Sequence, residues 1–550
     1  MINTERMQKY GPLLFAATGT VLVLWQMLLP GYVLMWDMVF GPSQMFPTFS
    51  GLENSAPLQL VIYALGLMVP MWIVQKVILV GIVFSFFYLP IKFFPLHIDS
   101  WARYAAASLF AVNPFVYERF LAGQWAVLCA YALLMPFVYF LFRLLESPTK
   151  RTALSLAAVM LLINLFSLHV FVMTVLIVGF ACAVRLFVRD QIGAFILNAL
   201  LAGSIVAIVS LYWLVPLFIY PESSPVGAFT EAHWKAFATS IDASVGASAN
   251  VLMLFGFWGE SYPWMQTLLS PKDIPLVFIP TLLALAVVIV TGIAMSMRAL
   301  QSRTRAILLF SIAVLAFVFS LGLAPSFAHD FNLWLFEHVG FWRGFRDTEK
   351  WSMWLALAFA CFYAAGTSGI VRKVRPHLVR TAQFVFVMLP IFYTFTLPFG
   401  LMGQARAVEY PESWYGMNAI LAADPTCKAL FLPWHEYYWL AFNDNRLTAN
   451  VAPRFFDCTI VSSRDAEIGG VGDQGADAVY EALARTVTDP DTEHVDAALA
   501  LMRAEGIRYI IATYDLGSLD TFTYPFLSAP GLTTLTERGV DNLHVVLIRL

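Results

Sequence analysis

Residues 274–297 read "IPLVFIPTLLALAVVIVTGIAMSM", a run of 24 residues without a charged side chain. A helix of about 20 apolar residues is long enough to cross the hydrocarbon core of a bilayer. Comparable apolar runs recur along the chain from Gly11 to about Met402. The stretch is therefore one of a series of spans, and the sequence predicts a polytopic α-helical membrane protein.

The composition agrees with this class and excludes others. Hydrophobic residues make up 59% of the 550 residues and charged residues only 13%, about half the charged share of a soluble domain. The net charge is −3, but residues 404–550 hold ten Lys and Arg against twenty Asp and Glu. The preceding membrane part is thus net basic and the tail acidic. No basic patch with interleaved aromatic residues indicates nucleic-acid binding.

The basic residues predict the orientation of the spans, because Lys and Arg accumulate in short cytoplasmic loops. Placing the three strongest basic groups inside leaves Arg6 and Lys9 inside as well, and gives about eleven spans with the tail outside. Residues 1–10 are short and polar, and the run after them has no cleavage signal, so we expect the first span to be retained. The basic groups are Arg298, Arg303 and Arg305; Arg372, Lys373, Arg375 and Arg380; and Arg143, Lys150 and Arg151. The spans are about 11–30, 76–92, 101–116, 123–143, 152–167, 169–187, 192–219, 274–297, 305–324, 351–370 and 381–402.

Residues 57–75, "PLQLVIYALGLMVPMWIVQ", do not fit this count. They are long enough to span, but a span there would put the later basic groups on the wrong face. We therefore expect a helix that lies in the outer interface or re-enters the membrane, broken at Pro70. The alternative is a true span together with another loop that is misassigned.

We expect the chain to fold into two domains. Residues 1–403 form the transmembrane domain, with outer loops 31–75, 113–124, 220–273 and 325–350. Residues 404–550 form an extracytoplasmic α/β domain, because a helical pattern that ends at Gly506 precedes an apolar strand. Its expected strands are 429–434, 507–514 and 544–550. Cys427 and Cys458 both lie in this tail and either form a disulfide there or stay free.

Asp37 is the first candidate catalytic residue. It is the only charge in "WDMVFGP", residues 36–42, where the chain leaves the first span. A carboxylate beside Trp36 and Phe40 is partly desolvated, which raises its pKa toward the range useful for accepting a proton from a hydroxyl. The alternative is a loop carboxylate that keeps the first loop in water. Glu53, in the same loop, is a second candidate for contact with the substrate.

A second group of candidates lies in "NPFVYERFLAGQW", residues 113–125. Glu118, Arg119 and Gln124 lie at the outer boundary of the membrane, where the positive-inside rule gives no reason for an arginine. A planar guanidinium suits a phosphate, and Gln124 can donate hydrogen bonds to it. The alternatives are an arginine that reaches lipid headgroups, or a local pair of Glu118 with Arg119.

Two further stretches carry candidates for substrate contact. In "GFWRGFRDTEKW", residues 340–351, Arg343, Arg346 and Lys350 lie outside against the same rule and predict an anionic lipid group, or else a rim of membrane anchors. In "FGFWGESYPW", residues 255–264, Trp258 suits stacking on a sugar and Glu260 suits bonding to hydroxyls; interfacial aromatic residues are the alternative.

His169 lies near an outer turn and is expected to be structural. No zinc-ligand spacing, GxSxG motif or Asp-x-Asp in the first loop is present.

Taken together, these stretches resemble the GT-C class of glycosyltransferases, integral membrane enzymes that use polyprenyl-phosphate-linked sugars. The likeness rests on the acid in the first outer loop, the Arg followed by Gly-Gln in the next, about eleven spans and an outer α/β tail. "NPFVYERFLAGQW" and "GFRDTEKW" look like a little-characterised prokaryotic group of this class. They are also similar to the membrane region of arabinofuranosyltransferases, although this chain is shorter.

The resemblance implies roles for individual residues. Asp37 would be the catalytic base, Arg119, Gln124 and Arg346 would lie at the lipid phosphate, and Lys350 would assist them. Many GT-C enzymes have paired acids in the first loop, and here "WDMV" offers one. No protein-bound metal is therefore expected, and a divalent cation stays open as a cofactor.

The implied function is transfer of a sugar from a polyprenyl-phosphate donor to a cell-envelope glycan or lipid acceptor, at the outer face of the plasma or inner membrane and with inversion. Partners would be the donor, the acceptor and membrane lipids. One alternative is a transporter of lipid-linked sugars, which would place ionisable groups near the midplane and show internal repeats. The other is a non-catalytic envelope-assembly protein with the same fold.

Overall fold

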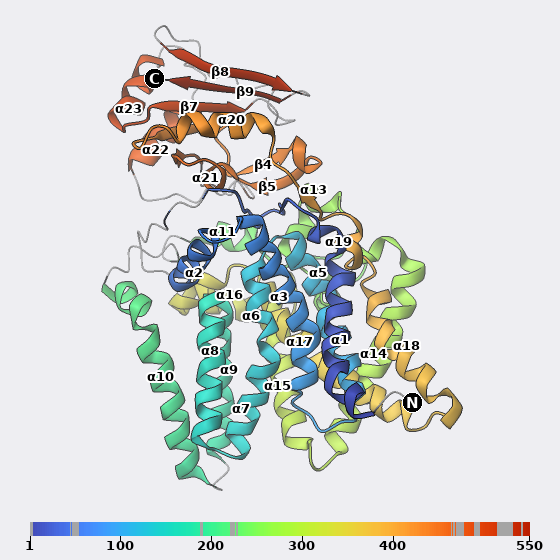
Figure 1. Cartoon of the computed structure of the whole chain (residues 1–550). Coiled ribbons are helices and arrows are strands. Elements are labelled where there is room, and N and C mark those ends of the chain that lie inside the picture. The colour runs from blue at the N-terminus through green and yellow to red at the C-terminus, as the bar shows by residue number, and fades with distance from the viewer. Residues whose placement is uncertain are drawn as a thin grey trace.

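The computed structural model describes residues 4–43, 46, 54–187, 191–219, 226, 229–463, 465, 468, 478–488, 495–513, 532–540 and 543–549. Figure 1 shows a bundle of long helices, one end of which is covered by a smaller region of strands and helices from the C-terminal part of the chain. We call this end of the bundle the sheet side and the opposite end, where the chain begins, the far side.

Nine helical stretches of the described residues are long and apolar enough to cross a membrane. They confirm the predicted polytopic helical architecture. The two other expected spans, 101–116 and 152–167, coincide with shorter helices, α4 (Ala102–Ala111) continuing into α5 (Pro114–Leu121), and α8 (Lys150–Phe166). The nine stretches contain α1 (Thr4–Leu24), α3 (Met71–Lys92), α6 (Trp125–Ala132) with α7 (Leu134–Glu146), α9 (Leu168–Leu186), α10 (Ile192–Ile219), α14 (Pro275–Arg298), α15 (Arg303–Ser320), α17 (Ser352–Val371) and α18 (Val379–Tyr393) with α19 (Pro398–Met402).

The segment expected to be interfacial is broken as predicted. Helix α2 (Ala56–Gly66) ends before Pro70, and α3 begins at Met71. Eleven residues extend about 16 Å, roughly half the hydrocarbon core, so α2 is too short to span. It lies at the sheet side of the bundle (Figure 1).

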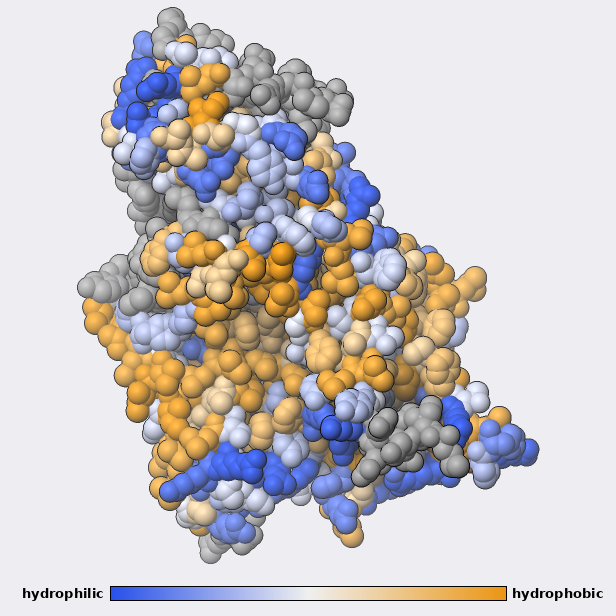
Figure 2. Space-filling model, in the orientation of Figure 1, coloured by the Kyte–Doolittle hydropathy of each residue, from blue (hydrophilic) through white to orange (hydrophobic). Residues whose placement is uncertain are grey.

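The surface of the bundle is apolar at mid-height and polar at the far side (Figure 2). Leu200 on α10 and Leu276 and Val287 on α14 are among the exposed apolar side chains, as expected of helices that face lipid. Basic residues close several helices at the far side, among them Arg143 at the end of α7 and Arg298 at the end of α14.

Helix α17 is the central helix of the bundle, and nearly all its residues are buried. A Cβ atom on Gly366 would collide with the backbone of Val288, and one on Gly292 would collide with the backbone of Phe362. The two glycines thus allow α14 and α17 to pack backbone against backbone, a common device of membrane helices. This contact fixes the C-terminal half of α17 against α14.

The C-terminal region is built on a five-stranded sheet with the order β6-β3-β7-β9-β8. Strands β6, β3 and β7 are parallel, and β9 and β8 are antiparallel additions. The strands predicted at 429–434, 507–514 and 544–550 correspond to β3, β7 and β9. The bounds are β3 Lys428–Leu432, β6 Thr459–Val461, β7 Tyr509–Thr513, β8 Thr533–Val540 and β9 Leu543–Arg549.

Helices cover both faces of this sheet. Leu430 and Leu432 of β3 join the cluster formed with α22 (Ala478–Thr488) and α23 (Val495–Ala504), whereas Phe431 points to the other face, against Trp414 of α20 (Glu412–Leu421). The alternation follows from the two-residue period of a strand. The predicted helix before Gly506 is α23, and Gly506 has the left-handed φ of +70° that suits a helix end.

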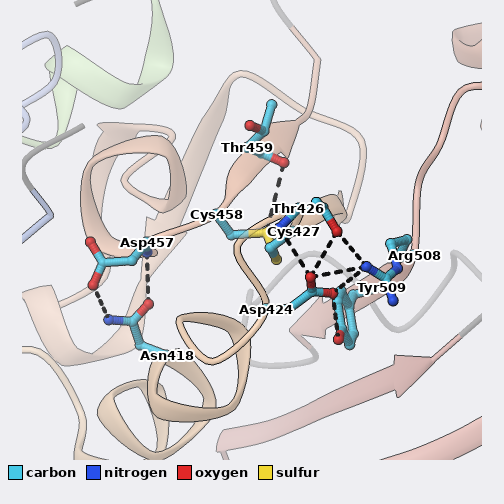
Figure 3. Close-up of a disulfide and its surroundings, with 9 residues drawn as sticks. All are labelled: Asn418, Asp424, Thr426, Cys427, Asp457, Cys458, Thr459, Arg508 and Tyr509. Atoms are coloured by element: carbon cyan, nitrogen blue, oxygen red, sulfur yellow. Dashed lines mark hydrogen bonds and ion pairs between the residues drawn. A yellow bond between two sulfur atoms is a disulfide. The ribbon is translucent and has the colours of Figure 1, made fainter. Parts of the chain in front are cut away.

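Cys427 and Cys458 form a disulfide (Figure 3). Each precedes one of the neighbouring strands β3 and β6, so the bond ties the two parallel strands at the same edge. Beside it, Asp424 accepts hydrogen bonds from Arg508 and Tyr509.

Candidate active site

Asp37 lies at the tip of a tight turn on the sheet side. Met35 and Met38 exchange backbone hydrogen bonds across the turn, and the Asp37 nitrogen donates to the carbonyl oxygen of Ala122 at 3.1 Å. Gly123, with φ of +67°, lies directly beneath. A Cβ atom there would collide with the turn and lie 2.9 Å from the Asp37 nitrogen. The turn after α5 therefore sets the position of the candidate base.

The C-terminal region holds the same loop from above. Strand β1 (Tyr32–Val33) pairs with β2 (Ala407–Val408), and the Trp36 carbonyl oxygen accepts from the nitrogen of Ala449, 2.8 Å away, on β5 (Arg446–Ala449). The first loop is thus paired with strands from the C-terminal part of the chain.

The most direct of these contacts reaches the carboxylate itself. The Tyr437 hydroxyl, on β4 (Tyr437–Leu440), donates to Asp37 Oδ1 at 2.9 Å. The Tyr437 ring also packs against Trp36, with ring centroids 5.5 Å apart. A group from the C-terminal region therefore fixes the orientation of the candidate base.

The surroundings of Asp37 suit a general base. Its side chain is exposed although the flanking Trp36 and Met38 are buried. The protein crowded around it raises the pKa of Asp37 to about 6, against the hydrogen bond from Tyr437 and the positive charge of Lys350, which lower it. A carboxylate with this pKa is ionised at neutral pH and can still take up a proton.

Arg119 is the centre of a buried ionic network. Its guanidinium is fully buried and donates to Asp347 Oδ2 at 2.7 Å, to Glu349 and to Gln124 Oε1 at 2.8 Å. The Phe257 ring lies 4.7 Å from its Cζ atom. The network joins α5, the turn that precedes α6, and the segment leading into α17.

The direct phosphate contact expected of Arg119 stays a prediction, and this geometry does not favour it. A guanidinium without exposed surface that already binds two carboxylates has no face to offer a ligand. Burial lowers the pKa of Arg119, but Asp347 and Glu349 more than compensate, and its pKa is raised. Burial raises the pKa of Asp347, but Arg119 and Lys350 outweigh it, and its pKa falls to about 2. Arg119 and Asp347 are therefore both charged at all working pH values. Through its hydrogen bonds Arg119 holds the neighbouring side chains in position.

Two other cations act on Asp37 or on Tyr437, which is bonded to it. Lys350 Nζ lies 3.4 Å from Asp347 Oδ2, and its charge acts on Asp37. The Arg346 guanidinium lies between two aromatic rings, 4.4 Å from the centroid of Phe229 and 4.3 Å from that of Phe237. Its charge acts on Tyr437. Asp37 therefore faces a cationic boundary, with Gln124 beside it.

Two of the other candidates, Arg343 and Trp258, are engaged or buried within the protein. Arg343 donates to the carbonyl oxygens of Phe336 and Glu337 and closes α16 (His329–His338). Trp258 is 3% exposed, so the ring surface expected to stack on a sugar is closed.

Three candidates remain to be placed. Glu118 and Glu260 face a separate cavity beside α5. Glu53 lies outside the described residues. His169 bonds to the carbonyl oxygen of Gly344 at 2.9 Å, and its side chain is exposed.

The donor set does not fit a resident metal ion. Among the residues that the structure describes, no group of three or more His, Cys, Asp or Glu could hold one. The two carboxylates of the network, Asp347 and Glu349, are both engaged by Arg119.

Sequence reasoning missed two residues of this site. Tyr437 is 400 positions from Asp37 and has no motif around it. Glu349 stands inside the quoted stretch 340–351, and a signal was available there: an isolated outer arginine needs carboxylate partners, and "RDTEK" offers two.

Comparisons with known proteins bear on the fold. No family model and no curated protein sequence matches the chain. The cryo-EM structure of the arabinofuranosyltransferase AftD from mycobacteria matches with a TM-score of 0.60 and 14% identity, over 98% of this chain and 40% of that one. Two structures of a mutant of that protein match with TM-scores of 0.57 and 0.51 at 15% and 16% identity, over 98% of this chain and 41% of theirs.

This likeness shows the fold. The chain has the GT-C-like fold of membrane glycosyltransferases, as the resemblance in the sequence implied. It spans about two fifths of the length of the arabinofuranosyltransferase that it matches.

Proposed function

We propose that this protein is a glycosyltransferase that moves a sugar from a polyprenyl-phosphate donor to a cell-envelope glycan or lipid acceptor. The observation that carries the proposal is the exposed Asp37 carboxylate, with a pKa of about 6, set beside Lys350 and the Arg119 network at one end of a membrane-spanning bundle. The fold supports it, because the structural neighbours are glycosyltransferases.

The reaction is a single displacement at the anomeric carbon. An acceptor hydroxyl oxygen attacks this carbon as its proton passes to Asp37. The bond from the anomeric carbon to the phosphate oxygen breaks, and polyprenyl phosphate leaves with the bonding electrons. Attack opposite the leaving group inverts the anomeric centre. Asp37 is poised for this step because the Tyr437 hydroxyl orients it through Oδ1.

The phosphate is held by the cations at the boundary. Negative charge grows on the leaving phosphate in the transition state, and fixed positive groups stabilise it there. We assign this role to Arg346 and Lys350, with Gln124 as a hydrogen-bond donor. Arg119 holds Asp347 and Gln124 in place and so acts through them.

The reaction takes place on the outer face of the plasma or inner membrane. Two observations support this orientation. The Cys427–Cys458 disulfide suits an oxidising compartment, and Arg143 and Arg298 close their helices at the far side, where the positive-inside rule expects the cytoplasm. Residues 1–403 then form the transmembrane domain, with the donor lipid between its helices, and residues 404–550 form the extracytoplasmic domain that fixes the Asp37 loop.

The test is a transfer assay with purified protein in nanodiscs. Candidate polyprenyl-phosphate sugars are supplied with a glycan acceptor, and release of polyprenyl phosphate is measured together with the extended glycan. The proposal requires both products in equal amounts. If no donor is consumed while the protein moves lipid-linked sugar across the membrane of proteoliposomes, the protein is a transporter and the proposal fails.

A further inference from the structure

A polar cavity lies beside α5, which contributes Tyr117, Glu118 and Leu121 to its lining. Its volume is about 280 Å³, close to the lower end of the range for ligand pockets and suited to one small ring. Four carboxylates line it: Glu118 from α5, Asp242 from the loop before α12 (Gly246–Leu252), Glu260 from the segment before α13 (Pro263–Gln266), and Asp273. Serine and glutamine side chains add further polar groups, and leucine, isoleucine and methionine side chains complete the lining.

One cation in the lining, Lys272, is held by the protein itself. Its Nζ atom lies 3.1 Å from Asp242 Oδ2, 3.7 Å from Glu260 Oε2 and 2.6 Å from the amide oxygen of Asn250. It also lies 4.2 Å from the ring centroid of Phe255. The carboxylates outnumber this one ammonium group, so the cavity repels a phosphate and attracts hydrogen-bond donors.

The lining offers a donor as well as acceptors. Glu118 is 1% exposed, and burial together with the neighbouring Glu260 raises the pKa of Glu118 well above its usual range. The raised pKa favours the form of Glu118 that carries an O–H, and the serine hydroxyls of the lining present further donors and acceptor oxygens. This mixture matches the hydroxyl and ring oxygens of a sugar.

The lining of the cavity adjoins the Arg119 network and the loop that carries Asp37. Glu118 and Arg119 are successive residues of α5, and Glu349 acts on both of them. Trp36, next to Asp37, packs against Trp264 with ring centroids 4.2 Å apart, two residues before the lining residue Gln266. The lining therefore packs, through Trp264, against the loop that carries Asp37.

We propose that this cavity binds a sugar residue of the acceptor glycan that carries no negative charge and does not itself receive the transferred sugar. The proposal rests on the function proposed above. The two groups of charges then have complementary tasks, because Arg346 and Lys350 hold the lipid phosphate and the acidic cavity takes the polyhydroxylated acceptor.

Binding is tested directly, by saturation-transfer NMR on the full chain in nanodiscs. The probes are methyl glucoside, glucosamine and glucose 6-phosphate. We expect the first two to bind and the phosphate to bind at least about tenfold more weakly. Glu260→Gln and Asp242→Asn each remove one charged acceptor and should weaken methyl glucoside about tenfold. Asp330→Asn, a fully exposed carboxylate outside the cavity, is the matched control and should change nothing.

Two results would overturn the proposal. One is equal or tighter binding of glucose 6-phosphate, and the other is the lack of saturable binding of either uncharged or amino sugar that responds to the cavity variants. The experiment is repeated with Asp37→Asn, which should bind normally. If transfer fails but sugars bind in the cavity, only the glycosyltransferase proposal falls.

A transfer assay then tests the place of the cavity in the reaction. The cavity variants should raise KM for disaccharide and longer acceptors about tenfold and leave KM for a monosaccharide acceptor unchanged. A rise that is equal for short and long acceptors contradicts the proposal.

Discussion

Replacement of Tyr437 by Phe separates the role of the C-terminal region from that of the bundle. Tyr437→Phe keeps the ring that packs on Trp36 and removes only the hydroxyl that donates to Asp37 Oδ1. In the wild type, the hydrogen bond from Tyr437 lowers the pKa of Asp37 and so favours its ionised form. Without it the carboxylate holds its proton to a higher pH, so the base is inactive over a wider acidic range.

The size of the effect follows from the strength of the bond. Hydrogen bonds to charged groups contribute about 1.5–3 kcal/mol, and 1.36 kcal/mol corresponds to one pH unit. Solvent reaches Asp37 and can replace part of the bond, so the lower end applies. The acidic limb of kcat/KM, at about pH 6 in the wild type, should move to about pH 7. The rate at pH 6 then falls about fivefold, and the rate at pH 8 is nearly unchanged.

The assay is the pH profile of sugar transfer for wild type and Tyr437→Phe, with Tyr415→Phe as the matched control. Tyr415 is an exposed tyrosine of α20 in the same region. The control should keep the wild-type profile. An unshifted acidic limb in Tyr437→Phe, or an equal loss at every pH in a folded protein, would refute the assignment of Tyr437 to the base.

Three further changes test the supports of the site. Arg119→Met removes the guanidinium shared by two buried carboxylates, Asp347 and Glu349, and should cost about 3–5 kcal/mol. The melting temperature should fall further than in Arg406→Met, which breaks an exposed ion pair. Gly123→Ala should displace the Asp37 turn and lower kcat about 10²-fold with little change in expression. Loss of the disulfide, which closes 31 residues, should destabilise the C-terminal region by about 3–4 kcal/mol in chemical denaturation. A wild-type value in any of these assays would contradict the structural role assigned to the Arg119 network, to Gly123 or to the disulfide, respectively.

The fold was predictable where the signal is local. An apolar run such as 274–297 is a helix by length and composition alone, and Pro70 marks the break between α2 and α3. The strands at β3 and β7 have continuous apolar runs that fit a buried parallel sheet. These elements need no knowledge of their neighbours.

The site was predictable only in part, because its contacts join distant segments. Asp37 was identified because no other charged residue lies near it in sequence. In the folded protein it has a partner, because the Tyr437 hydroxyl donates a hydrogen bond to it. Arg119 was assigned to a phosphate, whereas Asp347 and Glu349 occupy it. Sequence order cannot show which of several nearby charges a buried guanidinium selects.

The central claim is that Asp37 takes a proton from the acceptor during transfer. The most direct measurement is kcat of Asp37→Asn in nanodiscs, with polyprenyl-phosphate sugar and acceptor at saturation. A general base contributes about 10²–10⁴-fold. The account therefore predicts a loss of that size in kcat, with donor binding unchanged. A variant that transfers sugar at the wild-type rate would contradict it.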